Sequence, residues 1–423
     1  MSVAHAAALL LRIAATLLAS TPAPAPSSSP GGATNPPAAS ATVVFGGDIV
    51  PHRDLLAAFA QHGADDLFGA VSPVLQAADL ALANFETPAA PSRPLTQTTV
   101  RFNVHADFVQ AMARAGFDAA AMANNHSFDT GVAGVGETVA TLRSTNIRVI
   151  GGALAGEDPM SAQSFPIAGG TLCIIAVTRI LNFDMTMPGP GQPRIALARS
   201  QPAEEQDALI AAVRGSRARC GGVIVSLHSG VEYQERPEPI DRVYFHRLAD
   251  AGADAVIAHH SHVVQPVELY RSGARAVPIF YSLGNFVSNQ GNTADSGVNP
   301  APGETPSISL DARLREGILA VLRFENAGGR NLRLAEFGYV PMWTVNTRIV
   351  ASRTGEPLHI RAALMPRDGG GDRLLHDRWD RLVHRIGADH LLPASSLPGS
   401  VEGYRRSDEV VLGSRRALTT PAH

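Results

Sequence analysis

The sequence contains no lysine, so every long cationic side chain among its 423 residues is an arginine. Schiff-base catalysis and P-loop phosphate binding both require the lysine amine, and neither chemistry is therefore available to this chain. Cysteine is scarce, with only Cys173 and Cys220. Two cysteines exclude a scaffold built on disulfides and cannot by themselves form a zinc site, although one disulfide is compatible with an exported protein.

The chain also lacks a strong charge imbalance and long apolar runs. Its formal net charge of -3 gives no reason to expect a nucleic-acid partner or a basic membrane-binding face. Outside the first twenty residues, no stretch approaches the ~20 apolar residues that a membrane-spanning helix needs. A hydrophobic content of 45% is ordinary for a globular protein with a sizeable core.

The amino-terminal region has the pattern of an export signal. Residues 6–19 form an apolar stretch that is interrupted by Arg12, and small residues and prolines follow them. We predict a signal peptide over residues 1–25, with a short membrane anchor as the alternative. Residues 26–40, rich in proline, alanine and serine, are predicted to be a linker. The expected location is therefore extracytoplasmic, either secreted or associated with the cell envelope.

From residue 42 onward, apolar strand patterns alternate with helical patterns, which is typical of an α/β fold. Strands are predicted over 42–46, 79–85, 118–123, 147–151, 171–178, 221–227, 254–258, 263–270, 276–283, 317–325 and 332–340. Helices are predicted over 52–62, 67–77, 105–115, 132–144, 202–214 and 240–251. The closely spaced strands after residue 254 indicate a second, partly antiparallel sheet packed on the first. We expect a four-layer α/β/β/α sandwich.

This sandwich is predicted to occupy residues 41–350 as one domain. Residues 289–310 are rich in glycine, proline, serine and asparagine, and are expected to form a loop. Residues 351–423 are predicted to be an extension with an amphipathic helix near 372–386 and a disordered tail.

Metal-ligand residue types follow five of the predicted strands directly. Ligands in α/β proteins are expected at the carboxyl ends of strands, where loops and helix starts meet. The residues in these positions are Asp48, Glu86, Asn124, Asn125, His126, His228 and the run His259-His260-Ser261-His262. The sequence therefore predicts that polar side chains from distant segments converge at one edge of the fold.

Taken singly, several of these residues have structural explanations. Asp48 can be a turn residue or helix N-cap, Glu86 a surface carboxylate, and His126 or His228 a hydrogen-bonded core histidine. Three histidines in four residues after a buried strand favour metal binding. A mixed set of carboxylates, carboxamide and imidazoles suits Mn²⁺, Fe²⁺ or Zn²⁺, and is large enough to hold two such ions about 4 Å apart.

The order of these motifs resembles one known family. The motifs are Gly47-Asp48, Asn84-Phe85-Glu86, Asn124-Asn125-His126 with Asp129 and Gly131, His228-Ser229-Gly230-Val231-Glu232, His259-His260-Ser261-His262-Val263, Tyr281-Ser282-Leu283-Gly284-Asn285-Phe286 and Val340-Pro341-Met342-Trp343. Together they resemble the CapA, or poly-γ-glutamate synthesis, family. That family is similar in fold to calcineurin-like metallophosphoesterases, which agrees with the layered α/β prediction.

The resemblance implies roles for particular residues. It implies that two divalent transition-metal ions (Mn, Fe or Zn) are bound by Asp48, Glu86 as the bridging ligand, Asn125, His228, His260 and His262. His126 follows the ligand asparagine and would be the catalytic residue that protonates the leaving oxygen or binds the developing oxyanion. Asp129 would orient the His126 ring, and the alternative for it is a carboxylate in the first turn of a helix.

Two further residues are candidates for substrate binding. Arg53 matches an arginine common at that place in the family and would bind a carboxylate or phosphate, although a solvated arginine on a helix surface is the alternative. Asn285 lies in a turn expected at the rim of the site, where it would bind substrate or position its neighbours by hydrogen bonding. The sequence departs from the family at Ala258, Ser261 and Ser229, which leaves every candidate ligand in place.

The residues and the resemblance together support two functions. The first is a metal-dependent hydrolase of metallophosphoesterase type, acting on a phosphoester or on an amide or polymer bond in poly-γ-glutamate capsule biosynthesis or envelope polymer processing. The alternative is a non-catalytic component that handles or exports the polymer. The expected partners are an anionic polymer or phosphoester substrate and other capsule-synthesis proteins at the membrane, without nucleic acid.

Overall fold

The computed structural model describes residues 39–95, 101–182, 187–292, 307–366, 373–392 and 397. The predicted signal peptide and nearly all of the predicted linker lie outside the described residues, as do residues 293–306 of the predicted loop and residues 398–423 of the predicted tail. Within the described ranges, no helix combines the length and the apolar character that crossing a bilayer requires.

The first sheet has eight strands, with β1 (Ser40–Val50) near its centre. Parallel strands continue from β1 in the order β2 (Leu80–Phe85), β3 (Ala119–Ala121) and β4 (Arg148–Ile150). On the other side, antiparallel strands continue through β14 (Glu316–Asn326), β15 (Leu332–Asn346) and β16 (Ile360–Leu364). The short strand β13 (Asn285–Ser288) pairs with the carboxyl end of β1.

The second sheet has six strands in the order β11-β12-β10-β9-β7-β6. Its four inner strands are parallel, namely β7 (Gly170–Thr178), β9 (Gly222–His228), β10 (Ala255–His259) and β12 (Arg275–Phe280). The edge strands β6 (Gln163–Ile167) and β11 (Val267–Ser272) run antiparallel to their neighbours. The described residues also include a separate ribbon of β5 (Gly152–Ala153) and β8 (Arg194–Ile195). The partly antiparallel second sheet agrees with the sequence prediction.

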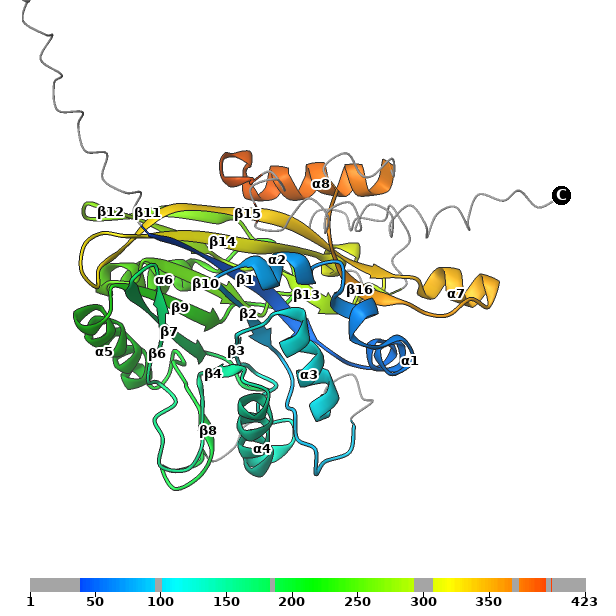
Figure 1. Cartoon of the computed structure of the whole chain (residues 1–423), viewed down its shortest axis with the longest axis horizontal. Coiled ribbons are helices and arrows are strands. Elements are labelled where there is room, and N and C mark those ends of the chain that lie inside the picture. The colour runs from blue at the N-terminus through cyan, green and yellow to red at the C-terminus, as the bar shows by residue number, and fades with distance from the viewer. Residues whose placement is uncertain are drawn as a thin grey trace, which may run out of the picture. The chain divides into compact units, whose positions relative to one another are not determined.

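Three hydrophobic clusters show that the layers are stacked in the order α/β/β/α. Along β1, Val44 faces the helices while Val43 and Phe45 face the second sheet, because side chains alternate across a strand. The first outer layer contains α1 (Asp54–Phe68), α2 (Ser72–Ala77), α3 (Ala106–Ala115) and α4 (Gly131–Ser144). On the other side, α5 (Ala203–Arg219) and α6 (Pro239–Ala251) pack on the second sheet (Figure 1). The four-layer prediction is confirmed.

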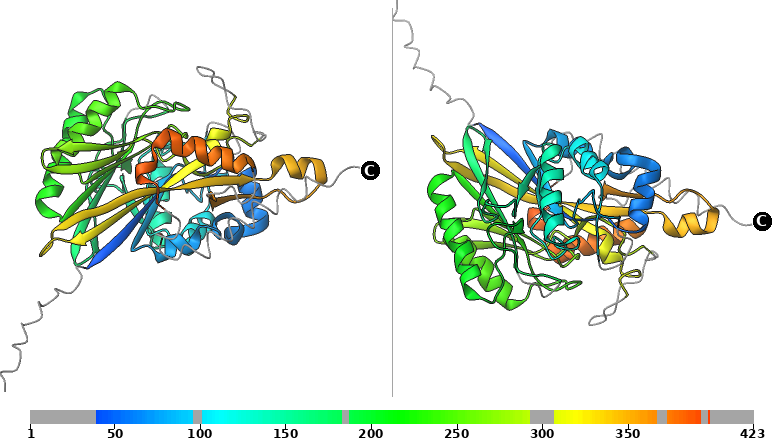
Figure 2. Two further views of the ribbon diagram at one scale, coloured as in Figure 1. Left: turned by 90° about the horizontal axis from the view of Figure 1, so that it is seen from above. Right: turned by 90° about the horizontal axis from the view of Figure 1, so that it is seen from below.

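The fold continues past residue 350, the predicted end of the domain. Strand β16 pairs with β15 over five residue positions, so it extends the first sheet. Helix α8 (Arg373–Ile386) follows and lies over β15 (Figure 2), and its Trp379 and Leu382 belong to a buried hydrophobic cluster with residues of both sheets. A buried ion pair of 3.1 Å between Arg378 and Glu316 also joins α8 to the start of β14. The described part of the extension is therefore integral to the sandwich.

Residues at the carboxyl ends of parallel strands in both sheets lie at one edge of the fold. In the first sheet, Asp48 is level with Asn84 on β2 and with Asn285 on β13. In the second sheet, His259 at the end of β10 is level with His228 at the end of β9. Because these are the carboxyl ends of parallel strands, the motifs predicted from the sequence lie where α/β folds usually bind ligands.

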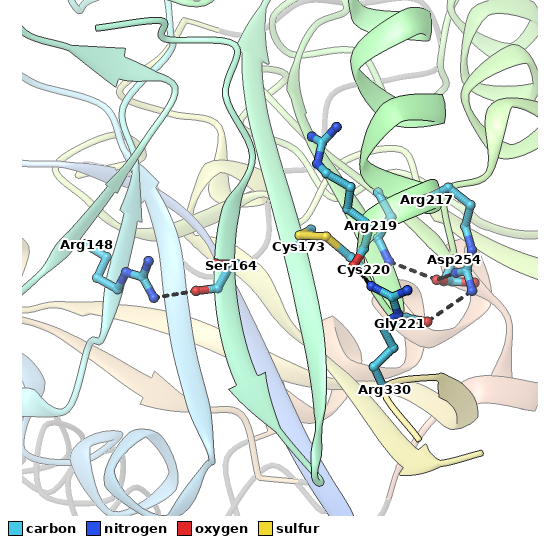
Figure 3. Close-up of a disulfide and its surroundings, with 10 residues drawn as sticks. Arg148, Ser164, Cys173, Arg217, Arg219, Cys220, Gly221, Asp254 and Arg330 are labelled. Atoms are coloured by element: carbon cyan, nitrogen blue, oxygen red, sulfur yellow. Dashed lines mark hydrogen bonds and ion pairs between the residues drawn. A yellow bond between two sulfur atoms is a disulfide. The ribbon is translucent and has the colours of Figure 1, made fainter. Parts of the chain in front are cut away.

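A disulfide joins Cys173 of β7 to Cys220, which ends α5 just before β9 (Figure 3). The two Cα atoms are 6.0 Å apart and both side chains are buried. Beside the bridge, Arg217 donates a 2.7 Å hydrogen bond to Asp254, which tethers the end of α5 to the start of β10. The disulfide therefore fixes one end of the α5 crossover between two neighbouring parallel strands.

Replacing both cysteines, Cys173→Ala with Cys220→Ala, should lower the free energy of unfolding by about 2–4 kcal/mol, because the bridge restricts an unfolded segment spanning 47 positions. Urea unfolding of the two proteins under oxidising conditions measures this difference. Adding dithiothreitol should destabilise the wild type by a similar amount and leave the double variant unchanged. Equal midpoints for both oxidised proteins would contradict the expectation.

Candidate metal centre

Asp48 is turned into the interior by a close approach of two chain segments. The ladder between β1 and β2 shifts register between Gly46 and Asp48. At Gly47, a Cβ atom would lie 2.0 Å from the carbonyl oxygen of Gly284, so only glycine allows the two backbones to approach this closely. The Asp48 amide then donates a 2.9 Å hydrogen bond to that same carbonyl. The Gly-Gly-Asp motif thus places the carboxylate fully inside the protein.

The predicted ligands fall into two overlapping groups. One group contains Asp48, Glu86 and His262, and the other contains Glu86, His228 and His260. Within each group, the potential ligand atoms lie within 4.8 Å of one another, and all five side chains are buried. Glu86 belongs to both groups, because its Oε1 atom lies 3.7 Å from Nε2 of His228 and 3.7 Å from Nε2 of His262. This is the position that a bridging ligand requires.

Asn125 adds a sixth side chain. Its Oδ1 atom is 2.8 Å from Nε2 of His228, so it stands beside the group that contains Glu86, His228 and His260. The structure thus brings all the predicted ligands together, and their binding of metal stays a prediction. The group containing Asp48 has three predicted ligands, whereas the other has four.

Two unpartnered polar atoms at the centre agree with the prediction that these residues bind cations. Among the described residues, Glu86 Oε1 and His260 Nδ1 are buried without a hydrogen-bond partner. Buried polar atoms are nearly always satisfied, so these two atoms remain available to act as ligands. No arginine within the described ranges forms an ion pair with Asp48 or Glu86. Oxygen and imidazole donors around two buried carboxylates without an arginine partner are the chemistry that divalent transition metals prefer.

Burial and neighbouring charges shift the pKa values of the candidate ligands. Burial raises the pKa of Glu86 well above its ordinary value, and the charge of Asp48 raises it further. Burial alone would raise the pKa of Asp48 too, but His259 and His262 hold it well below its ordinary value. Burial would lower the pKa of His262, yet the negative charges of Glu86 and Asp48 raise it to about 10. His262 therefore carries a proton at neutral pH that a metal ion must displace.

The other two imidazoles are already in the form that binds metal. Burial lowers the pKa of His260 to about 3, with a further contribution from the charge of His262. Burial and neighbouring histidines likewise keep the pKa of His228 well below its ordinary value. Both rings are therefore neutral at pH 7, and a neutral imidazole is the ligand form.

Three residues at the centre have a strained backbone. His260 (φ 96°), His262 (φ 57°) and Tyr233 (φ 66°) have left-handed backbone conformations although none of them is glycine. Such conformations persist only where the surrounding structure imposes them, and they cluster at functional sites. Here the turn after β10 places both imidazoles beside the carboxylates of the first sheet.

His126 and Asp129 form the expected pair. Nδ1 of His126 lies 2.7 Å from Oδ2 of Asp129, which also accepts a 2.7 Å hydrogen bond from the Phe102 amide. The Phe102 ring stacks on the His126 ring with centroids 4.1 Å apart. The carboxylate therefore holds the Nδ1 proton and leaves Nε2 for proton transfer. This contact agrees with the orienting role predicted for Asp129, while catalysis by His126 stays a prediction.

The two predicted substrate-binding residues differ in their surroundings. Arg53 is exposed in the turn between β1 and α1, with a positive φ of 51°. Asn285 is buried, and its Oδ1 atom lies 3.0 Å from Nδ1 of His262. Its amide nitrogen donates 2.8 Å hydrogen bonds to Gln290 and to the Leu314 carbonyl. Asn285 thus positions His262, one of the two roles that the sequence allowed, and substrate binding by either residue stays a prediction.

Three residues at the site received no role from the sequence. Asn84 donates to the carboxylates of both Asp48 and Glu86. Asn182 accepts a 2.8 Å hydrogen bond from Asn125 and lies 3.4 Å from both ring nitrogens of His126. Glu232, at the exposed edge, lies 3.9 Å from His262. A polar residue within the buried strand β2 was a usable signal for Asn84, whereas nothing in the sequence marked Asn182.

Comparison with known proteins gives a family match and several relatives. The family model described as bacterial capsule synthesis protein PGA_cap matches residues 42–290. The PGA biosynthesis protein CapA of Bacillus subtilis is 29% identical, covering 59% of this chain and 63% of the relative. The capsule biosynthesis protein CapA of Bacillus anthracis is 28% identical, with coverages of 60% and 61%. The match thus spans about three fifths of the length of these relatives.

A third relative is described as a probable polyglutamine synthesis accessory protein of Mycobacterium tuberculosis, 30% identical over 50% of this chain and 56% of the relative. Among solved structures, a putative 5'-nucleotidase from Staphylococcus aureus in complex with alpha-ketoglutarate has a TM-score of 0.39 and 14% identity, covering 71% of this chain and 54% of that one. A hypothetical protein from Thermus thermophilus also has a TM-score of 0.39, with 15% identity and coverages of 71% and 98%. Similarity at this level carries no functional argument.

Purified protein should contain about two transition-metal ions per chain, and His260→Ala should lose about one of them, because His260 belongs to only one of the two groups. Elemental analysis of protein prepared without chelators measures this content. His246→Ala is a matched control, since His246 contacts Glu268 outside the centre at 3.0 Å. Metal-free wild type, or identical contents in wild type and His260→Ala, would contradict the expectation.

Proposed function

Because the chain belongs to the bacterial capsule synthesis protein family PGA_cap, we propose that it is a metal-dependent hydrolase acting in poly-γ-glutamate capsule biosynthesis or envelope polymer processing. The observation that carries the proposal is the position of Glu86, whose Oε1 atom is shared by two groups of buried candidate ligands. A pair of divalent ions in such a site supplies an activated water and a clamp for an oxygen of the scissile group.

The side chains beside the ligands suit hydrolysis. Asp129 holds the Nδ1 hydrogen of His126, and the doubly protonated ring would give its Nε2 proton to a leaving oxygen or nitrogen and become the neutral ring that Asp129 orients. Asn125 lies between the candidate ligands and the candidate proton donor, because it contacts His228 and precedes His126 in the chain. Asn182 covers the His126 ring and holds the Asn125 amide, which restrains both side chains in one arrangement.

The nature of the scissile bond is the less constrained part of the proposal. The candidate ligands and His126 are compatible with a phosphoester, and equally with the amide bonds of an anionic polymer such as poly-γ-glutamate. The relatives from Bacillus are named for PGA and capsule biosynthesis, which favours the polymer. Arg53, exposed beside the end of β1, would then meet a carboxylate of the polymer or a phosphate.

A second candidate function is that of a non-catalytic component that handles or exports the polymer. The mycobacterial relative is named as an accessory protein of synthesis, which favours a role without turnover. In that case, the metal centre would hold carboxylates of the polymer, and other capsule-synthesis proteins at the membrane would be the partners. The contact between His126 and Asp129 has no evident purpose in such a role, so we prefer hydrolysis.

We also propose an extracytoplasmic location, secreted or attached to the cell envelope. The bridge between Cys173 and Cys220 supports it, because disulfides form and persist in oxidising compartments. The apolar run at residues 6–19 supports export as well. Polymer and capsule-synthesis partners at the outer face of the membrane would be accessible from this location.

Hydrolysis of bis(p-nitrophenyl) phosphate by the Mn²⁺-loaded protein should be measurable, and His126→Ala should reduce kcat by about 10²–10⁴-fold through loss of the proton donor. Chelation should abolish turnover, and added Mn²⁺ should restore it. Asp129→Asn should give a smaller loss, because it changes the orientation of the ring and leaves the imidazole in place.

The same proteins should be compared on poly-γ-glutamate by measuring its chain length. His246→Ala serves as the control, because that residue lies outside the centre. Metal-loaded wild type that binds poly-γ-glutamate and cleaves neither substrate would refute the hydrolase and favour the polymer-handling role.

A further inference from the structure

Asn84 is the one described side chain that contacts members of both ligand groups without being a predicted ligand from either. Its amide nitrogen lies 2.8 Å from Oδ1 of Asp48, 3.2 Å from Oε2 of Glu86 and 3.3 Å from Nδ1 of His228. Asp48 belongs to one group and His228 to the other, while Glu86 belongs to both. Asn84 itself is buried, so water does not compete for these contacts.

The contact with Glu86 decides which carboxylate oxygen is free. Asn84 engages Oε2, whereas Oε1 has no hydrogen-bond partner within the described part of the chain. That unpartnered oxygen lies 3.7 Å from Nε2 of both His228 and His262. As long as Asn84 retains Oε2, Glu86 presents one oxygen to both groups and cannot turn its second oxygen toward either.

The position of Asn84 is itself firmly determined. It lies on β2, level with Asp48 on β1, and two residues before Glu86, so strand alternation places both side chains on the same face. Its Oδ1 atom accepts a 3.3 Å hydrogen bond from Asn124, which also donates 2.8 Å to the Phe85 carbonyl. The hydrogen bond from the buried Asn124 amide thus fixes the orientation of the Asn84 amide.

We infer that Asn84 is a positioning residue: it holds Oε2 of Glu86, so that Oε1 would be the single oxygen offered to metal ions in both ligand groups, an arrangement that would favour magnetic coupling between the ions. The inference rests on the proposed metal centre and adds to it the mode of bridging. Without the Asn84 amide, the Glu86 carboxylate would be free to rotate. It would then bind one ion only, or bind the two ions through different oxygens and hold them farther apart. Either change would weaken the binding of the second ion and the magnetic coupling between the two ions.

The test is electron paramagnetic resonance of protein loaded with two equivalents of Mn²⁺, combined with calorimetric titration. Wild type should show the spectrum of an exchange-coupled pair. Asn84→Ala should show the six-line signal of uncoupled Mn²⁺, with the second ion bound about 10–100-fold more weakly, as is typical when a partner of a metal ligand is removed. Neither readout depends on turnover.

Asn103→Ala is the matched control for loss of a buried amide. Asn103 is fully buried and makes its side-chain hydrogen bonds to the backbone of Ala90, Arg93 and Pro94, away from the ligands. It should lower thermal stability and leave the coupled spectrum intact. If Asn84→Ala does not fold, Asn84→Leu keeps a similar volume but can neither donate to Glu86 nor bind metal, so it should lose the coupling as well.

The outcomes separate the two proposals. A coupled spectrum and wild-type affinity for the second ion in a folded Asn84 variant would overturn the positioning role, while leaving the metal centre established. Absence of a coupled signal in wild type that binds two ions would overturn the single-oxygen bridge. Wild type that binds no Mn²⁺ would refute the metal centre itself. Loss of coupling in Asn84→Ala with retention in Asn103→Ala is the expected result.

Discussion

The burial of Asp48 and Glu86 without a compensating arginine is the constraint around which the carboxyl edge of both sheets is arranged. Both carboxylates are fully buried, and within the described residues their polar neighbours are amides and imidazoles. Burying charge in this way is unfavourable unless it is paired or coordinates a metal. Several strained or crowded features nearby serve this placement, including the contact of Gly47 with Gly284 and the left-handed conformations of His260 and His262.

The parts of the fold that the sequence revealed are those with long, uninterrupted apolar runs. Strands such as β1, β7 and β9 are buried on both faces between layers, and their continuous hydrophobic patterns allow them to be predicted from the sequence. Strand β16 was missed because its five residues, Ile-Arg-Ala-Ala-Leu, carry too short and too mixed a pattern, and only pairing with β15 makes it a strand. Strand β13 was missed because its four residues lie within a motif that was interpreted as a turn. Helix α8 was found from its amphipathic pattern, but its docking through Arg378 and Glu316 depends on residues far apart in the chain.

The candidate site divides in the same way. Residues that directly follow strong strands were predicted, because strand ends and ligand types coincide in the sequence. Residues that act through those ligands were harder to find, since their roles depend on orientation. Asn84 was visible as a polar residue inside an apolar strand, but only the distances to Asp48 and Glu86 reveal what it does. Asn285 was expected at a rim and instead contacts His262 from a buried position. Asn182 lies 56 positions beyond His126, and no local pattern connects the two.

The chemistry of the donors follows the architecture. The candidate oxygen ligands Asp48, Glu86 and Asn125 extend from the first sheet, and the candidate imidazole ligands of His228, His260 and His262 extend from the second. Each ligand group therefore contains donors from both sheets, so a bound ion would join the two sheets at this edge. The disulfide cannot do this, because both of its ends belong to the second sheet and its α5 crossover. Elsewhere the sheets are held by apolar packing of residues such as Phe45, Ile224 and Ile257. Ions that bound donors from both sheets would bind the docked sheets and not the separated ones, so metal binding and sheet docking would stabilise each other.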